Sequence, residues 1–296
     1  MKQQEFVNRS ITYFALLVTG VVMVYPLVFM ILGSMTTLEE YARTTVMPMP
    51  SQVSFEKHLE LLRTDLWPAF RITLIRVVFY VVVTVTVSLL AGYAFSRLHF
   101  RGKNLLFMFF LTGLVVPFIL TSLPTYMMMA RFPLVGGNNL QGIGGHGFVN
   151  EWPALFILGW VDVFAIFLMK QSYDMLPVEY EEAAKIDGAG FLTIIFRVYL
   201  PLLRPAIIAV VIIVAVGIWN DYYFPLLVVA GNRDLAPVAL RVQRVIYDLA
   251  QREGLYNFPY PTIFAAATLA AVPPLLLYLF LQRYFVQGLA AAGIKG

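Results

Sequence analysis

Long apolar runs separated by short polar segments dominate the pattern of this 296-residue chain. A helix needs about 20 mostly apolar residues to cross the hydrocarbon core of a bilayer. Six stretches meet or approach that length, and charged or turn-forming residues bound most of them. The pattern therefore predicts six transmembrane helices, over residues 11–33, 77–95, 104–130, 152–169, 205–230 and 261–282.

Composition supports an all-α, multi-pass membrane protein. The chain is 60% hydrophobic and 13% charged, whereas soluble domains contain about 25% charged residues. It has no cysteine, so disulfides and thiolate metal sites are excluded. The net charge of +4 is modest, and no basic patch interleaved with aromatic residues appears. The basic residues suit loops that face anionic membrane lipid better than they suit nucleic acid.

Charge asymmetry between the loops predicts the topology. The first apolar run is longer than the hydrophobic region of a cleavable signal, so we expect it to remain as a span. An even number of spans places both termini on one side. Residues 97–103 carry three Lys or Arg in seven positions, whereas residues 131–151 carry one in twenty-one. The positive-inside rule therefore places residues 97–103, both termini and the segment beginning at Glu179 in the cytoplasm.

Three segments are expected on the outer side. Residues 34–70 are polar and mixed, and residues 132–151 are rich in Gly and Asn, typical of a flexible loop. Residues 142–147 match G-x-G-x-x-G, but they lack the strand and helix that a nucleotide site requires. Residues 236–254 predict an amphipathic helix that lies on the membrane surface or docks a partner protein. Its apolar face contains Val238, Val242, Val245, Ile246 and Leu249, and its polar face Arg241, Arg244 and Asp248.

An acidic, Ala-rich segment lies between the fourth and fifth predicted spans. Pro177 and three glutamates suit the first turn of a helix, where the helix dipole favours negative charge. Glu181 and Lys185 form an i,i+4 pair, and Gly188 is a C-terminal stop signal. A second short helix with an apolar face follows and ends near Pro201. This pair of helices either folds against the ends of its own spans or docks a soluble cytoplasmic partner.

Carboxylates, aromatic rings and hydroxyl groups near the predicted spans define a candidate solute pathway. Asp162 and Asp221 lie at membrane depth, where acids are costly and face a cavity or a partner. Neighbouring rings and hydrogen-bonding groups suit a sugar, although Asp221 also suits a structural contact between spans. The third span contains prolines, which favour a bent, pathway-lining helix. The candidate residues are Asp162, Trp219, Asn220, Asp221, Tyr222, Thr125 and Tyr126.

The sequence contains no recognisable catalytic or nucleotide-binding motif. No G-x-x-x-x-G-K-[ST] motif is present, so any ATPase must be another polypeptide. His58, His99 and His146 are scattered over different loops, and no H-E-x-x-H motif accompanies them. We therefore expect no catalytic residue, metal or cofactor in this chain.

The acidic segment resembles the EAA loop of binding-protein-dependent ABC importers. Glu182-Ala183-Ala184, three residues, Gly188, nine residues and Val198-Tyr199-Leu200-Pro201 match the loop pattern, with Val198 in place of the usual Ile. Residues 93–97, 219–221 and 288–296 also match that family. The chain looks like a carbohydrate-uptake permease of the maltose-permease-G type.

The resemblance implies the type I ABC importer permease fold, with six spans and a cytoplasmic coupling helix between the fourth and fifth. Residues 1–66 would form the first span and outer loop, 67–283 the transmembrane domain, and 284–296 a cytoplasmic tail. The implied partners are a second homologous permease, two ATPase subunits that bind ATP and Mg, and an extracytoplasmic sugar-binding protein. The cargo would be a saccharide crossing the cytoplasmic (inner) membrane. The implied ATPase-coupling residues are Glu182, Ala183, Ala184, Asp187, Gly188, Leu200 and Pro201.

Three alternatives stay open at this point. The same architecture imports non-sugar solutes such as amino acids or glycerol phosphate. A proton-coupled secondary transporter would use Asp162 and Asp221 as a relay, although such a carrier needs no ATPase dock. A membrane enzyme is the third, and no catalytic constellation supports it. Whether a saccharide cargo is neutral or acidic also stays open.

Overall fold

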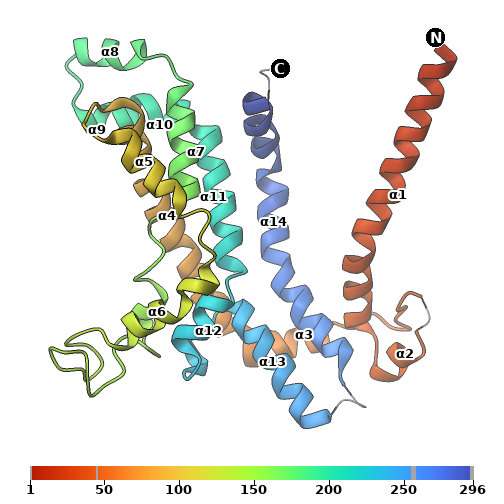
Figure 1. Cartoon of the computed structure of the whole chain (residues 1–296). Helices are drawn as coiled ribbons and strands as arrows, with labels where there is room; N and C mark the ends of the chain where they lie inside the picture. The colour runs from red at the N-terminus through yellow and green to blue at the C-terminus, as the bar shows by residue number, and fades with distance from the viewer. Residues whose placement is uncertain (1, 45, 255–257, 294–296) are drawn as a thin grey trace. The chain divides into compact units, whose positions relative to one another are not determined.

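A computed structural model describes residues 2–44, 46–254 and 258–293, and in these residues the regular structure is entirely helical (Figure 1). The chain divides into two compact units. The first unit comprises Met1–Trp67 and Arg241–Pro273, and the second comprises Pro68–Leu240 and Pro274–Gly296. The three boundaries fall at the first residue of α4 (Trp67–Arg97) and within α13 (Val238–Glu253) and α14 (Tyr260–Gly293).

The first unit contains α1 (Lys2–Met35), α2 (Leu38–Ala42) and α3 (Glu56–Leu61). A capping box begins α2, in which the Thr37 side chain accepts from the Glu40 amide and the Glu40 carboxylate accepts from the Thr37 amide. Aromatic rings pack nearby, with the Tyr41 and Phe264 ring centroids 5.6 Å apart. The loop after α1 is thus held by capping and ring packing.

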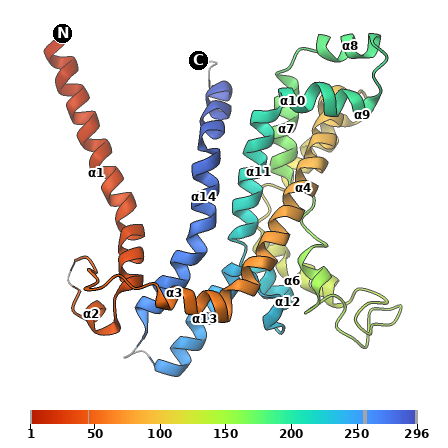
Figure 2. The same ribbon diagram turned by 180° about the vertical axis from the view of Figure 1, so that it is seen from behind.

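In the second unit, α4 (Trp67–Arg97), α7 (Val163–Asp174) and α11 (Arg204–Trp219) run side by side (Figures 1 and 2). They surround a core cluster that includes Tyr80, Met169 and Val210. Gly92 of α4 allows close contact, because a Cβ there would lie 2.7 Å from the Cβ of Met169. This core fixes the position of the segment that follows α7.

A second core cluster joins α6 (Phe118–Ala130) with α12 (Tyr223–Val229). It includes Met129, Leu155 and Val228, all of them buried. Both views place α6 and α12 at one end of the second unit and α8 (Glu179–Ile186) at the other (Figures 1 and 2). The core around α6 and α12 and the helix α8 therefore occupy opposite ends of this unit.

Three of the predicted spans are not continuous helices. Residues 104–130 form α5 (Lys103–Thr112) and α6, because Pro117 adopts an extended conformation that separates them. Residues 152–169 form a short 3-10 turn, Trp152–Leu155, and then α7. Residues 205–230 form α11 and α12, separated by a break after Trp219. The prediction of one helix for each of these stretches is wrong.

Among the described residues, three helices are long and apolar enough to cross a membrane. They lie within Asn8–Met35, Glu56–Arg97 and Tyr260–Gln282. A fourth candidate is the pair Phe191–Leu202 and Arg204–Trp219, which is bent by 84°. The predicted count of six spans stays a prediction.

The outer segment 132–151 is a loop, as its composition predicts, and hydrogen bonds of one side chain connect parts of it. The Asn138 side-chain amide donates to the carbonyls of Ala130 and Phe132, and its oxygen accepts from the Gly145 amide. The predicted amphipathic helix at 236–254 is confirmed as α13.

Candidate coupling surface and candidate solute cavity

The sequence signals at the two ends of α8 are largely confirmed. Gly188 has a φ of +78°, and its amide donates to the carbonyl of Lys185 at 3.0 Å. The Ala189 amide donates to the carbonyl of Ala184 at 2.9 Å. These two bonds and the left-handed glycine define a Schellman motif. Pro177, expected in the first turn, instead lies just before the helix, which begins at Glu179.

The segment after α8 turns sharply into α11. It consists of α9 (Phe191–Thr193), a π-helical turn (Ile194–Tyr199) and α10 (Leu200–Leu202). Ile194 and Ile195 are buried in the core, as the predicted apolar face requires. Pro201 lies within α10, and the helical segment ends one residue later at Leu202, near the position that the sequence predicts.

The predicted coupling residues divide into an outer and an inner group. Glu182, Ala183, Asp187, Gly188 and Pro201 are exposed, whereas Ala184 and Leu200 pack against the core cluster.

The tip of α8 is apolar, since Ile186 is 86% exposed there. Its side chain, with the exposed carboxylate of Glu182, forms a surface that the chain itself leaves uncovered. An apolar tip with a charged flank suits docking into a cleft of another protein.

Glu181 faces the interior of the chain, whereas Glu182 is exposed. Glu181 is 4% exposed, and its carboxylate accepts hydrogen bonds from the Tyr93 hydroxyl at 2.8 Å and the Tyr199 hydroxyl at 2.9 Å. The Lys185 amino group lies 2.7 Å from the same carboxylate, which confirms the i,i+4 pair. Burial raises the pKa of Glu181, but the hydrogen bonds from Lys185, Tyr93 and Tyr199 outweigh it and leave this pKa below its ordinary value.

A cavity of ≈ 500 Å³ lies at the other end of the second unit. Its polar wall contains Arg76, Thr125 and Asp221. The aromatic side chains of Tyr80, Phe118 and Phe224 form much of the remaining wall. The wall is completed by Met128, Leu158, Gly159 and Ile218. A mostly apolar cavity with a few convergent polar groups is the usual form of a small-molecule site.

A buried ion pair forms the polar wall of the cavity. Arg76 Nη2 of α4 lies 2.7 Å from Asp221 Oδ2, and the arginine is fully buried. Asp221 Oδ1 also accepts from the Phe224 amide at 3.3 Å, at the start of α12. The two charges compensate each other, which a buried pair requires. Asp221 therefore combines both roles that its sequence position suggests, a contact between helices and a place on the cavity wall.

Only part of the predicted pathway lines this cavity. Asp221 and Thr125 do, whereas Trp219 is buried and packs against Phe70 at 5.7 Å between ring centroids. The remaining predicted residues, Asn220, Tyr222, Tyr126 and Asp162, are not among its lining residues.

Asp162 is placed differently from the prediction. It is the N-cap of α7, not a residue near the middle of an apolar helix, and its Oδ1 accepts from the Ala165 amide at 2.7 Å. An aspartate at this position satisfies an amide that has no partner within the helix.

Sequence reasoning missed Arg76, Tyr80 and Glu181. Arg76 directly precedes the predicted span 77–95, where a cation beside an apolar run requires a partner as much as an acid does. Glu181 showed only its pair with Lys185, because nothing in the local sequence indicates that Tyr93 approaches it from 88 residues away.

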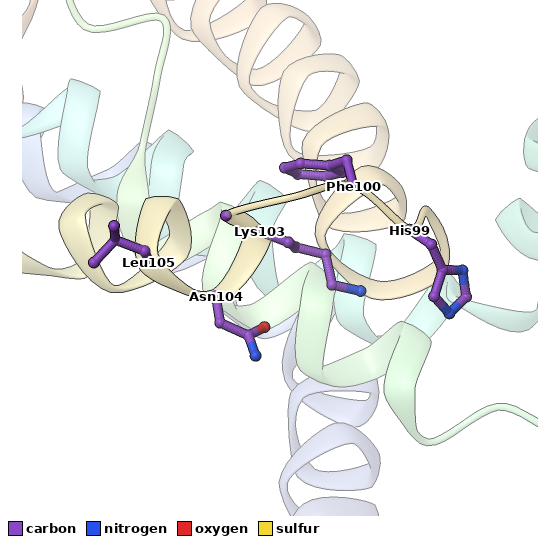
Figure 3. A pocket seen from close by; sticks show the side chains of 6 residues that line it. His99, Phe100, Lys103, Asn104 and Leu105 are labelled. Atoms are coloured by element: carbon purple, nitrogen blue, oxygen red, sulfur yellow. The ribbon is translucent and has the colours of Figure 1, made fainter.

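A smaller pocket of ≈ 280 Å³ lies at the turn between α4 and α5 (Figure 3). His99, Phe100 and Lys103 lie around it. The Lys103 amino group donates to the carbonyls of Ser96 and Leu98, near the C-terminal end of α4. Its charge thus stabilises the helix end. Within the described parts of the chain, no group of three His, Asp or Glu side chains is placed to hold a metal ion.

The helical architecture and the long apolar helices define a multi-pass membrane protein. Residues 84–291 match the family model described as the inner membrane component of binding-protein-dependent transport systems. The chain belongs to this family.

Relatives that are named as sugar-transport permeases match over most of their length. The arabinooligosaccharide transport permease AraQ of Halalkalibacterium halodurans is 28% identical, over 92% of this chain and 91% of the relative. The lactose transport permease LacG of Rhizobium radiobacter is 28% identical, over 94% of each chain. The trehalose/maltose permease MalG of Thermococcus litoralis is 25% identical, over 99% of each.

Solved structures confirm the fold. A chain of a bacterial ABC transporter involved in the import of the acidic polysaccharide alginate matches with a TM-score of 0.78 and 21% identity, over 95% of this chain and 98% of that one. A chain of an alginate transporter in complex with its pentasaccharide-bound periplasmic protein matches with a TM-score of 0.64 and 15% identity, over 94% of each. The predicted ABC importer permease fold is thereby confirmed.

Proposed function

We propose that this chain is a membrane-spanning permease subunit of an ATP-driven saccharide importer. The observation that carries this proposal is the exposed surface of α8, where Glu182 and Ile186 face away from the chain's own core. The named sugar permeases among its relatives support a saccharide as the cargo. The chain performs no catalysis, and ATP and Mg are bound by the partner.

The assembly would contain a second homologous permease, two ATPase subunits and an extracytoplasmic binding protein. The family description, which names a binding-protein-dependent system, supports these partners. In this arrangement α8 lies on the cytoplasmic side with both termini, and the cavity beside Asp221 lies toward the outer side, since the two occupy opposite ends of the second unit (Figure 1). Closure of the ATPase dimer would move α8 and through it the spans.

The cavity favours an uncharged saccharide. Arg76 neutralises Asp221, and the other lining side chains carry no charge. An acidic sugar would bring a carboxylate close to Asp221 without a free cation to balance it. The hydroxyl groups of a sugar can donate to the Asp221 carboxylate, while the exposed ring of Phe118 offers a surface on which the C–H side of a sugar can stack.

A proton relay through the two acids has no support in the geometry. Asp162 caps a helix, and Asp221 pairs with Arg76, so each carboxylate already has a partner other than the second acid.

ATPase coupling is tested with Glu182→Lys in the complex purified from membranes. We expect the ATPase subunits to dissociate, since the charge on the exposed face is reversed. Glu60→Lys is the matched control, because Glu60 is also exposed but lies in α3 of the outer segment. Equal retention of ATPase in both variants would refute the docking role.

Solute class is tested by uptake into proteoliposomes that contain the whole importer. Neutral oligosaccharides of arabinose, galactose and glucose are compared with oligouronates, glycerol phosphate and amino acids. Thr125→Val removes a hydroxyl from the cavity wall and should reduce uptake, whereas Thr121→Val on the exposed side of α6 should not. Preferred uptake of a uronate or a non-sugar solute would overturn this assignment.

A further inference from the structure

The three acids in the first turn of α8 have different surroundings. Glu179 and Glu182 are exposed, while Glu181 is buried and accepts hydrogen bonds from two tyrosines. A partner protein that binds the outer face of α8 can contact Glu179 and Glu182. Glu181 is available only to the chain's own interior.

The two tyrosines that contact Glu181 belong to different elements. Tyr93 lies in α4 and Tyr199 in the π-helical turn before α10, and both are buried. Their ring centroids are 6.0 Å apart at an interplanar angle of 62°. Because both hydroxyls bond to Glu181, this residue is held at the junction of three elements. Arg97 of α4 strengthens this junction, since its guanidinium donates to the carbonyls of Tyr173 and Leu176 at the end of α7.

Other attachments of α8 to the rest of the chain are weak. Tyr180 and Ile186 are 49% and 86% exposed, and Ala184 contributes only a small side chain to the core cluster. Hydrogen bonds to an ionised acceptor are stronger than those between neutral groups. The bonds to Glu181 are therefore the strongest connection between α8 and the transmembrane helix α4.

We propose that Glu181 is a positioning residue that ties the coupling segment to α4 through Tyr93, so that movement of α8 reaches the transmembrane helices. This inference rests on the proposed function, because it assumes that an ATPase moves α8. It assigns docking to the exposed residues and transmission to the buried carboxylate.

The structure supplies a matched pair of substitutions. Tyr93→Phe removes one hydroxyl that donates to Glu181. Tyr173→Phe removes a hydroxyl that is also buried but has no hydrogen-bond partner, in a ring whose centroid lies 5.8 Å from that of Tyr93. The two variants lose the same atom from the same cluster, and only one of them loses a bond to α8.

The experiment follows α4 in the assembled importer. The chain has no cysteine, so an environment-sensitive fluorophore on Leu74→Cys, an exposed position of α4, reports this helix alone once the partner subunits are also freed of cysteine. ATP is the probe. ATPase copurification and ATP hydrolysis are measured on the same preparations.

In Tyr93→Phe we expect ATPase copurification and hydrolysis to be retained, while the ATP-induced fluorescence change is reduced. The reason is that losing one bond to a charged group lowers the equilibrium constant of the contact between α8 and α4 by about ten-fold or more. Tyr173→Phe should behave as the parent. Equal signals in Tyr93→Phe and Tyr173→Phe, or loss of copurification in parallel with the signal, would overturn the inference.

Two further outcomes are decisive. If Tyr93→Phe does not assemble, Glu181→Gln is measured in its place, since an amide keeps the size of the carboxylate and weakens its bonds. Failure of both to assemble would make Glu181 structural and the inference wrong. If the parent importer itself shows no response to ATP, the proposed function fails, and that result is distinct from an intact response in Tyr93→Phe.

Discussion

Replacing Gly188 with Ala should loosen the end of α8 through backbone conformation alone. The glycine has a φ of +78°, and a Cβ built there meets no atom within 4 Å. The cost therefore has no steric contribution from the chain itself. It equals the penalty of a left-handed conformation for an L-residue, about 1–2 kcal/mol.

Hydrogen exchange of the permease without its ATPase subunits measures this cost. The reporting amides are those of Gly188 and Ala189, which donate to the carbonyls of Lys185 and Ala184. A loss of about 1–2 kcal/mol lowers their protection by roughly 5- to 30-fold. Gly190→Ala is the control, since that glycine is equally open but has a φ of −74°. Its protection should not fall.

Comparison of the two variants also separates conformation from docking. Backbone strain alone lowers ATPase affinity by no more than the same factor, so a larger loss in Gly188→Ala would place the new methyl group against the partner. Gly188→Asn should lie between Ala and the parent, because Asn tolerates the left-handed region better than other side chains. Equal exchange in Gly188→Ala and Gly190→Ala would refute the role of the Schellman turn.

Three further predictions follow from the other contacts. Arg76→Met or Asp221→Leu alone should destabilise the permease by about 3–5 kcal/mol, because either substitution leaves a buried charge unpaired. The double variant should lose less than the sum of the two. Thermal unfolding of the parent and the three variants checks this, and additive losses would contradict it. The Ser51 hydroxyl, with the backbone amides of Thr37 and Ser51, lowers the pKa of Glu40 from 4.5 to about 2. The stability that Glu40 contributes is therefore present above its ordinary pKa and lost as pH falls toward about 2; Ser51→Ala should raise its NMR titration midpoint, and an unmoved midpoint would refute the assignment. Asn138→Ala removes three hydrogen bonds from the outer loop, so limited proteolysis there should accelerate by about ten-fold or more; an unchanged cleavage rate would show that other contacts hold the loop.

The coupling segment could be predicted well because its signals are local. The glutamates of the first turn, the Glu181–Lys185 pair and Gly188 each act within one or two helical turns of their own position. Such effects depend little on the rest of the fold, so their spacing in the sequence is enough. The inward direction of Glu181 was not predictable in this way, because it depends on Tyr93 of a distant helix.

The breaks within three predicted spans have a different origin. Hydropathy records how apolar a stretch is, and residues 104–130 stay apolar across the break between α5 and α6. Pro117 indicates a bend, but whether one helix bends or two helices form depends on packing against neighbours. The break between α11 and α12 is held by the bond of Asp221 with Arg76, a contact across 145 residues.

The ion pair of Arg76 and Asp221 was predictable in part from the sequence. Charge near an apolar run is visible in sequence, and each residue alone indicates a need for a partner. From the sequence alone, either Asp162 or Asp221 could pair with Arg76. Two acids in neighbouring predicted spans also suggest a proton relay. The structure separates them, since Asp162 meets its need locally at the N-terminus of α7 and leaves Arg76 to Asp221. Because Arg76 is paired with Asp221, the cavity wall is polar but carries no net charge. A solute is therefore selected by hydroxyl groups that can bond to this wall and by apolar faces that can pack on its aromatic rings.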